Sequence, residues 1–191
     1  MTAARDALVH RLRLAYAGEL AAARAYAGHW RSVRDKGQKV DIQRIMREEL
    51  AHRARVGEMM RELGARPGKP RDLWMGTVGT AIAASCFVGG WYVPMYGAGR
   101  IERRNIWEYE VAARLALQAE RADFADELLG MAEVEWDHEK FFHDLVRGHR
   151  WHRRFHSWPD PPPKGEIRTS FDAGRPPCTG PESMRPAAVA P

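Results

Sequence analysis

Cysteine is scarce in this 191-residue chain, which contains only Cys86 and Cys178. Two cysteines so far apart do not make a disulfide framework, so we expect reduced thiols and a cytoplasmic protein. The N-terminal residues also lack the unbroken apolar stretch and small-residue cleavage site of a signal peptide, which supports the same expectation. β-branched residues are few, whereas Leu, Ala and Met are common. This composition favours an all-α fold and excludes collagen-like and disulfide-rich classes.

A strong excess of one charge is absent as well, since 30 Lys and Arg residues against 25 Asp and Glu residues give a net charge of +5. Most basic residues are arginines scattered through helical stretches that also contain Glu, so we expect no nucleic-acid partner. The one concentrated basic run, residues 147–154, contains Trp151. Interleaved aromatic and basic residues are typical of a surface that binds a bilayer or polyanion, and equally of a solvated helix end.

Charged residues are missing altogether from residues 73–99. The stretch is longer than the roughly 18 apolar residues that raise the question of a membrane span, but seven glycine and proline residues interrupt it. We therefore expect a helical hairpin, buried or facing a membrane, that breaks near residues 89–94. This expectation makes a membrane surface a candidate partner.

Four other segments carry apolar residues at alternating steps of three and four, the pattern of an amphipathic helix. They cover residues 4–33, 41–63, 98–119 and 123–149, with Asp41 as the expected N-cap of the second. Four long helices predict a four-helix bundle with an extra apolar helical segment between its second and third helices.

The second and fourth helices contain the same polar motif in the middle of their apolar stripes. Glu49-x-x-His52 recurs 86 residues later as Glu135-x-x-His138, and the flanking apolar positions recur at the same offset. Residues three apart lie on one face of a helix, so each glutamate and its histidine point in one direction. The chain therefore contains an internal repeat of chemistry as well as of hydrophobicity.

The first and third helices each supply one further carboxylate. Glu19 lies 30 residues before the first motif and Glu102 lies 33 residues before the second, with Glu108 as an alternative to Glu102. One Glu from each of two helices and Glu-x-x-His from each of the other two form the ligand set of a dinuclear metal site in a helical bundle. These oxygen and nitrogen donors suit two iron ions, and they also accept manganese.

Burying an unpaired carboxylate costs several kcal/mol, so several in one core need a compensating cation. A metal ion meets that need. The alternative is a metal-free interaction bundle in which arginines pair with these glutamates and the histidines are ordinary core residues. We expect Tyr109, which lies on the stripe of the third helix, to pack in the core beside the site rather than to carry electrons.

Over residues 7–146 the sequence resembles the demethoxyubiquinone hydroxylase family of ferritin-like di-iron proteins. The resemblance lies in residues 17–19 and 26–28, in both Glu-x-x-His motifs, and in Glu102 followed seven residues later by Tyr109. It implies a peripheral membrane enzyme that hydroxylates a quinone ring with dioxygen and reducing equivalents from NADH. The ligands that it implies, with Glu49 and Glu135 as bridging carboxylates, are Glu19, Glu49, His52, Glu102, Glu135 and His138.

The sequence departs from the family pattern in three places. Glu108 stands where the family usually has His, and Arg103 stands where a second Glu is usual. The apolar C-terminal helix of the family is replaced by the basic and aromatic run and by a segment with nine prolines from Pro159 onward. We therefore expect a di-iron bundle over residues 1–150 and a disordered tail over residues 151–191.

These observations predict a di-iron monooxygenase of ubiquinone biosynthesis that acts on a quinone-like, lipophilic ring at the inner face of the cell membrane, as a monomer or homo-oligomer. The alternative is a rubrerythrin-like or ferritin-like protein that detoxifies peroxide or handles iron. Rubrerythrins commonly carry a rubredoxin-type cysteine site, for which this chain has no cysteine pair. A large soluble iron-storage shell is disfavoured by the uncharged stretch of residues 73–99.

Overall fold

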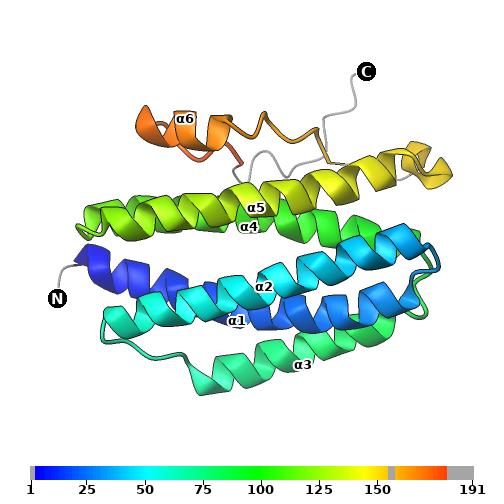
Figure 1. Cartoon of the computed structure of the whole chain (residues 1–191), viewed down its shortest axis with the longest axis horizontal. Coiled ribbons are helices and arrows are strands. Elements are labelled where there is room, and N and C mark those ends of the chain that lie inside the picture. Colours follow the sequence, from blue (N-terminus) through cyan, green and yellow to red (C-terminus); the bar gives the residue numbers. More distant parts are fainter. Residues whose placement is uncertain (1–2, 155–157, 180–191) are drawn as a thin grey trace. The chain divides into compact units, whose positions relative to one another are not determined.

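The structure is a computed structural model that describes residues 3–154 and 158–179, and every regular element within these ranges is a helix. The predicted all-α class is therefore confirmed. Figure 1 shows the elements in chain order: α1 (Ala3–Ser32), α2 (Lys36–Glu62), α3 (Lys69–Ser85), α4 (Tyr92–Gln118), α5 (Ala122–Arg147), the 3₁₀ turn η1 (Arg150–Arg153) and α6 (Glu166–Asp172).

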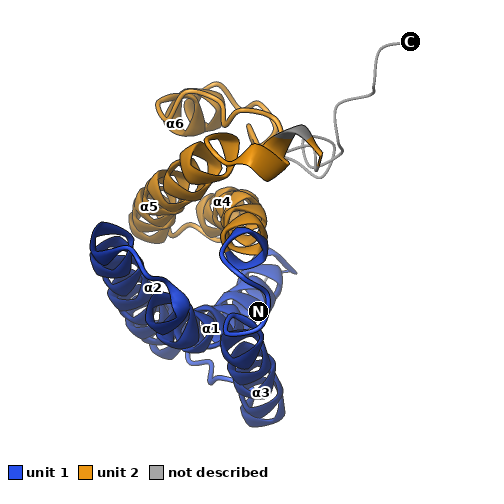
Figure 2. Ribbon diagram, turned by 90° about the vertical axis from the view of Figure 1, so that its right-hand side faces the viewer, with its two compact units in different colours: residues 1–94 blue, residues 95–191 orange. Residues whose placement is uncertain are grey.

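The chain divides into two compact units, residues 1–94 and 95–191. Figure 2 colours the first unit blue, with α1, α2 and α3, and the second orange, with α5, α6 and nearly all of α4. The boundary falls in the first turn of α4. Each unit thus contains one pair of long helices that carries a Glu-x-x-His motif. The expected grouping of residues 1–150 into one bundle stays a prediction.

The second helix begins earlier than its apolar pattern indicates. Its N-cap is Asp35, whose side chain accepts a hydrogen bond of 2.9 Å from the backbone N–H of Gln38. The expectation that Asp41 caps this helix was wrong, because Asp35 satisfies an N–H of the first turn and the helix then runs through polar residues before its apolar stripe begins. The turn between α1 and α2 is correspondingly short.

In the first unit, α1 packs against both α2 and α3, and the two contacts differ in chemistry. Both α1 and α2 bury large aliphatic side chains, among them Leu12 and Ile45. The contact with α3 is made through small residues. A methyl group built on Gly28 would meet Ala83 at 2.5 Å, and one built on Gly79 would overlap the backbone of Ala21. Glycine therefore allows α1 and α3 to approach until backbone touches backbone.

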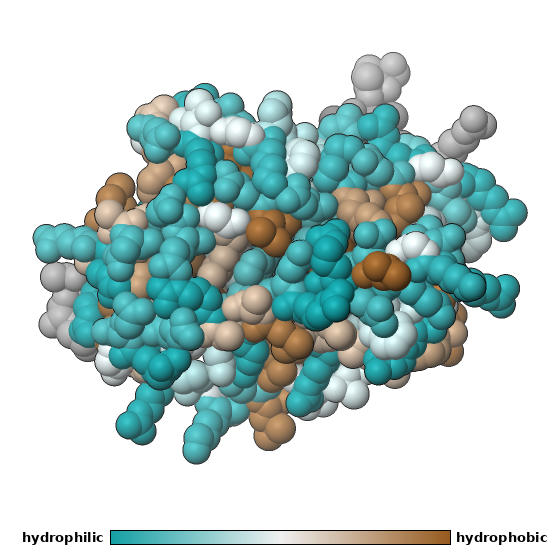
Figure 3. Space-filling view, in the orientation of Figure 1, coloured by the Kyte–Doolittle hydropathy of each residue, from teal (hydrophilic) through white to brown (hydrophobic). Residues whose placement is uncertain are grey.

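The uncharged stretch forms α3 from Leu73 onward, the turn of residues 86–91 and the start of α4. Several of its large side chains point into solvent, since Leu73, Trp74, Phe87 and Val88 are between 60% and 86% exposed. Figure 3 shows hydrophobic residues at the lower edge of this face, over α3, among predominantly hydrophilic neighbours. Among the described residues, no helix combines the length and hydrophobicity that a membrane crossing requires.

In the second unit, α4 and α5 lie side by side and are joined by the short turn of residues 119–121 (Figures 1 and 2). These helices bury Ile106 and Ala113 from α4 and Leu128 and Phe142 from α5 completely. Both helices match the predicted segments in their C-terminal halves, whereas α4 begins six residues before the expected start. Pro94 fits there because the first turn of a helix does not use its missing N–H.

The structure differs from the expected disorder over residues 158–179. Trp158 is buried, α6 packs against α5 with Ile167 fully buried, and the Arg168 side chain binds Glu133 and Asp126 at 2.8 and 2.7 Å. These contacts hold a proline-rich segment in place although it has little secondary structure of its own. The expectation for residues 155–157 and 180–191 lies outside the described residues.

The glycine contact between α1 and α3 can be tested with two Gly→Ala substitutions that should change the free energy of unfolding in opposite directions. We expect Gly79→Ala to lower the free energy of unfolding by about 1–3 kcal/mol, because the added methyl group forces α3 away from Ala21. Gly130→Ala in α5, where the methyl group meets nothing within 4 Å, should instead raise it by about 0.5–1 kcal/mol. Chemical denaturation measures both, and equal effects would contradict the close contact.

Candidate metal centre

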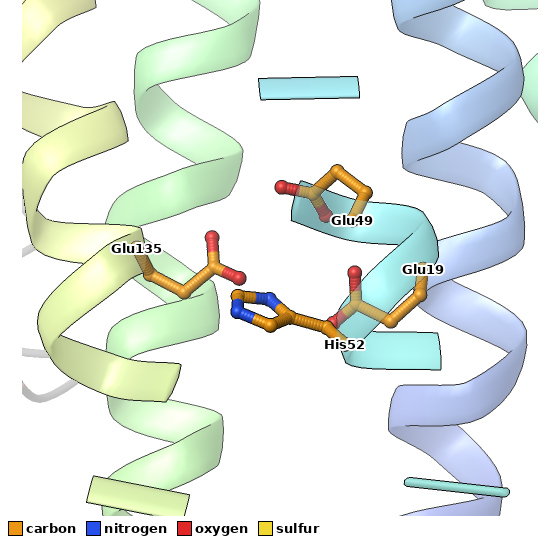
Figure 4. A group of neighbouring side chains, drawn as sticks. All are labelled: Glu19, Glu49, His52 and Glu135. Carbon is orange, nitrogen blue, oxygen red and sulfur yellow. The ribbon is translucent and has the colours of Figure 1, made fainter. Parts of the chain in front are cut away.

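The first unit gathers three of the predicted ligands. Glu19 comes from α1, and Glu49 and His52 come from α2. One donor atom of each lies within 4.8 Å of the donor atoms of the other two, and all three residues are buried. Figure 4 shows the carboxylate of Glu19 next to the imidazole of His52, with Glu49 almost one turn earlier on α2; the fourth labelled residue, Glu135, belongs to the second unit.

The local sequence explains this placement. Ile45 lies one turn before Glu49 and Val56 one turn after His52, and both are fully buried. On α1, Leu12 and Tyr26 flank Glu19 two turns away on each side and are buried as well. A helix that buries these apolar neighbours has to bury the polar residues between them, because all lie on one face.

The second unit repeats the arrangement with Glu102 from α4 and Glu135 and His138 from α5. Their donor atoms lie within 4.8 Å of one another, and all three side chains have no exposed surface. Nδ1 of His138 lies 3.5 Å from a carboxylate oxygen of Glu135. The side-chain amide of Asn105 donates a hydrogen bond of 2.9 Å to Oε2 of Glu102. We did not predict Asn105, although its place three residues after Glu102 was a usable signal.

The charge in this cluster shows why it fits a cation. Burial raises the pKa of Glu102 well above its ordinary value, and the neighbouring charge of Glu135 and a hydrogen bond with it raise that pKa further. His138 and Asn105 oppose the shift only partly. A divalent ion at these oxygen and nitrogen donors would supply the positive charge that favours the ionised carboxylates. The donor sets of both units therefore fit metal ions.

The two candidate glutamates of α4, Glu102 and Glu108, lie in different environments. Glu108 is partly exposed and pairs with Arg104 at 3.4 Å, one turn earlier on the helix surface. Glu102 is the one that lies beside Glu135. Tyr109 is buried on α4, seven residues and two helical turns from Glu102, and its role stays a prediction.

A separate cavity of about 470 Å³ opens at one end of the first unit, between the α1–α2 turn and the turn after α3. His29, Phe87 and Trp91 line it, and Trp91 donates a hydrogen bond of 2.8 Å to Gln38. Burial lowers the pKa of His29 to about 4, so its imidazole is neutral at physiological pH. His29 follows Glu19 by ten residues, or about 15 Å along α1, so this cavity does not surround the ligands of its unit.

Two further acidic residues of the second unit, Glu110 and Glu139, are fully buried. Glu139 forms an ion pair of 2.7 Å with Arg103, and both side chains are almost fully buried. Glu110 accepts hydrogen bonds from the backbone N–H of Cys178 at 3.0 Å and from the hydroxyl of Thr179 at 3.1 Å. Burial and the neighbouring Glu110 raise the pKa of Cys178 to about 12, so its thiol stays protonated. Arg103 had appeared only as a departure from the family pattern.

The helices and these clusters define an all-helical protein with buried carboxylate–histidine groups, the class that includes the ferritin-like metal proteins. The sequence profile of ubiquinone biosynthesis protein COQ7 matches residues 6–104, more than half of the chain. The chain belongs to this family, which is that of the demethoxyubiquinone hydroxylases and comprises enzymes of ubiquinone biosynthesis. The matched range contains the first Glu-x-x-His motif and Glu102, whereas Glu135 and His138 follow it. No curated protein and no solved structure gives a significant match to the chain.

The raised pKa of Glu102 predicts a pH effect on the metal-free protein. Because the folded state holds this proton more tightly than the unfolded state, stability should fall as pH rises above the ordinary glutamate pKa of 4.5, by at most about 1.4 kcal/mol per pH unit. Glu102→Gln cannot ionise, so its stability advantage over the metal-free wild type should grow from pH 5 to pH 8. The control, Glu108→Gln, should show no such growth. Thermal melts at both pH values measure this, and parallel curves for the two variants would contradict it.

Proposed function

We propose that the protein is a di-iron, oxygen-dependent monooxygenase that hydroxylates a quinone-like, lipophilic ring in ubiquinone biosynthesis. The observation that carries the proposal is that each unit places two carboxylates and one imidazole within 4.8 Å of one another in its core, in a chain of the COQ7 family. In the balanced reaction, one atom of dioxygen enters a ring C–H bond as a hydroxyl group and the other leaves as water. NADH, as the proposed source, supplies two electrons and one proton is consumed.

The six ligands that the sequence predicts would hold two metal ions. Four carboxylates and two imidazoles are enough for a dinuclear site, and the family resemblance assigns Glu49 and Glu135 as the residues that bridge the ions. When bound, two ferrous ions supply the electrons and open coordination positions that the activation of dioxygen requires. Manganese accepts the same donors, so metal analysis of the purified protein decides between them.

The residues of the chain prepare the site in three ways. Burial in the apolar stripes excludes water from Glu49, Glu102 and Glu135. The hydrogen bond from Asn105 fixes one oxygen of Glu102, and support of this kind orients a carboxylate that is to bind a metal. Because burial and Glu135 favour the protonated form of Glu102, uptake of a metal ion should release a proton there.

The exposed apolar residues of α3 and the following turn support a lipophilic substrate and a membrane surface as partners. Leu73, Trp74 and Val88 would each remove apolar surface from water on contact with a bilayer. A quinone with a hydrocarbon tail resides in that bilayer, so contact with the inner face of the cell membrane would bring enzyme and substrate together. Peripheral attachment is the proposed location.

The alternative function is peroxide detoxification or iron handling by a rubrerythrin-like or ferritin-like protein. Membership of a ubiquinone biosynthesis family favours hydroxylation over this alternative. Size-exclusion chromatography separates iron storage from the proposed enzyme, because storage needs a large soluble shell whereas the enzyme needs at most a small homo-oligomer.

The metal ligands give the direct test of the enzyme. Glu49→Ala and Glu135→Ala should each abolish turnover of a quinone substrate and lower the iron content from about two ions per chain, because each removes a proposed bridging carboxylate. The variants should keep the helical circular dichroism of the wild type. The control is Glu48→Ala, which removes a partly exposed ion pair with Arg44.

Iron analysis and mass spectrometry of the quinone product provide the readouts. Full activity in Glu49→Ala or Glu135→Ala would contradict the proposal. Less than one transition metal per wild-type chain after anaerobic ferrous loading would do the same.

The membrane contact has its own test. The double substitution Leu73→Ser and Trp74→Ser should weaken binding to phospholipid vesicles at least tenfold, because each inserted side chain contributes about 1.5–3 kcal/mol. Leu117→Ser, at a residue 53% exposed in the second unit, is the matched control and should leave binding unchanged. Vesicle co-sedimentation measures both, and equal binding by all three proteins would rule out a membrane contact through α3.

A further inference from the structure

Trp158 is the anchor of the C-terminal segment on the second unit. Its side chain is 1% exposed, although it belongs to a stretch without regular secondary structure. Its indole N–H donates a hydrogen bond of 2.9 Å to Oε1 of Glu139, and the same oxygen accepts one of 2.7 Å from Arg103. Arg103 also donates to the backbone carbonyl of Pro159 at 3.2 Å. One carboxylate oxygen therefore joins α4, α5 and the C-terminal segment.

The helices are shaped to receive this indole. Gly99 lies one turn before Arg103 on α4, and a methyl group at that position would overlap the ring of Trp158. His143 lies one turn after Glu139 on α5, and its Nε2 is 3.2 Å from the carbonyl oxygen of Trp158. We call the group of Gly99, Arg103, Glu139 and His143 the indole socket. Two residues from each helix form it, so the bound indole touches α4 and α5 together.

The indole socket lies at the level of the second cluster of candidate ligands. Arg103 directly follows Glu102 on α4, and Glu139 directly follows His138 on α5. Successive residues of a helix point about 100° apart, so the ligands and the ion pair occupy neighbouring faces of the same two turns. The Arg103–Glu139 contact thus links α4 to α5 at the height at which Glu102 meets Glu135 and His138.

We propose that Trp158, Arg103 and Glu139 are positioning residues for the metal ligands of the second unit, with the C-terminal segment closing the link between α4 and α5 from outside. This inference rests on the proposed metal site. Ligand positions are tight, because metal–ligand distances vary by only about 0.2 Å. A small rotation or slide of α5 against α4 would move Glu135 and His138 relative to Glu102 by more than that. A buried ion pair with a third donor resists such motion, because breaking it would leave charges unpaired in the core.

The remaining contacts of the segment do not replace this link. Arg168 of α6 binds Glu133 and Asp126, both on α5, and Lys164 binds Asp137, also on α5. These contacts fasten α6 and the residues before it to α5 alone. The end of the segment binds α4 instead, two and three turns after Arg103, where Glu110 accepts from Cys178 and Thr179 and Arg114 donates to the carbonyl of Arg175. The indole socket bridges two helices beside the ligands, so its loss should affect metal binding more than the loss of a contact elsewhere in the segment.

The test uses the full chain and Co²⁺ alone as the probe, because the visible absorption of bound Co²⁺ reports the geometry of its ligands. Trp158→Phe keeps an aromatic ring but removes the donor to Glu139. We expect it to weaken Co²⁺ binding about tenfold and to change the absorption band, as loss of support around a metal ligand typically does. The matched control is Trp151→Phe at the exposed tryptophan of η1, which should leave affinity and band unchanged.

A fall in melting temperature alone would not support the proposal, because any core substitution can cause it. Trp158→Phe with the affinity and absorption band of the wild type would overturn it. If that variant does not fold, Arg103→Lys asks the same question, since lysine keeps the charge but is shorter than arginine, whose Nη1 donates to both Glu139 and Pro159. Absence of Co²⁺ and Fe²⁺ uptake by the wild type would instead reject the proposed function itself, and this outcome is visible before any substitution is made.

Discussion

The burial of acidic side chains inside helical apolar stripes is the constraint on which the rest of this structure depends. Glu49, Glu102 and Glu135 have no exposed surface. Each such burial opposes folding by several kcal/mol unless a cation or a proton offsets it. The helices that carry these residues extend several turns to either side of them, and the apolar residues in those turns supply the favourable free energy. The helices α2 and α5 therefore have to be long, because their apolar turns offset the cost of burying the Glu-x-x-His residues in their middle.

The same periodicity that predicts the helices also predicts the clusters, because a stripe position is buried whatever residue occupies it. The Glu-x-x-His motifs and Glu19 could therefore be located from the sequence. The choice between Glu102 and Glu108 could not be made by stripe position alone. A local signal was present, since Arg104 stands four residues before Glu108 and favours a surface ion pair there. The start of α2 was missed because Asp35 and Asp41 are both good N-caps, and only the turn after α1 selects Asp35.

The ordered part of the C-terminal segment shows where sequence patterns fail. Its many prolines and lack of a period are typical of disorder, and local propensity offers nothing against that interpretation. What orders the segment comes from distant residues. Trp158 binds Glu139, Arg168 binds Glu133 and Cys178 binds Glu110, and the partners are 19, 35 and 68 positions apart in the sequence. The short windows in which local sequence patterns are recognised do not contain both partners of such a pair. The order therefore appears only once α4 and α5 lie side by side.

The helix α3 reverses the usual arrangement of a surface helix, in which large apolar residues face the core. Its buried positions are the glycines Gly76 and Gly79, and its largest residues, Leu73 and Trp74, point outward. An ordinary helix contributes to folding through large inward side chains and tolerates change on its outer face because that face is polar. Here the inward face carries only glycines and small residues such as Ala83 and has no room to enlarge, while the bulky outward residues make little contribution to the core. Selection for a stable fold and selection for the outer surface therefore act on separate residues of α3, and the outer surface can diverge in sequence without loss of the fold.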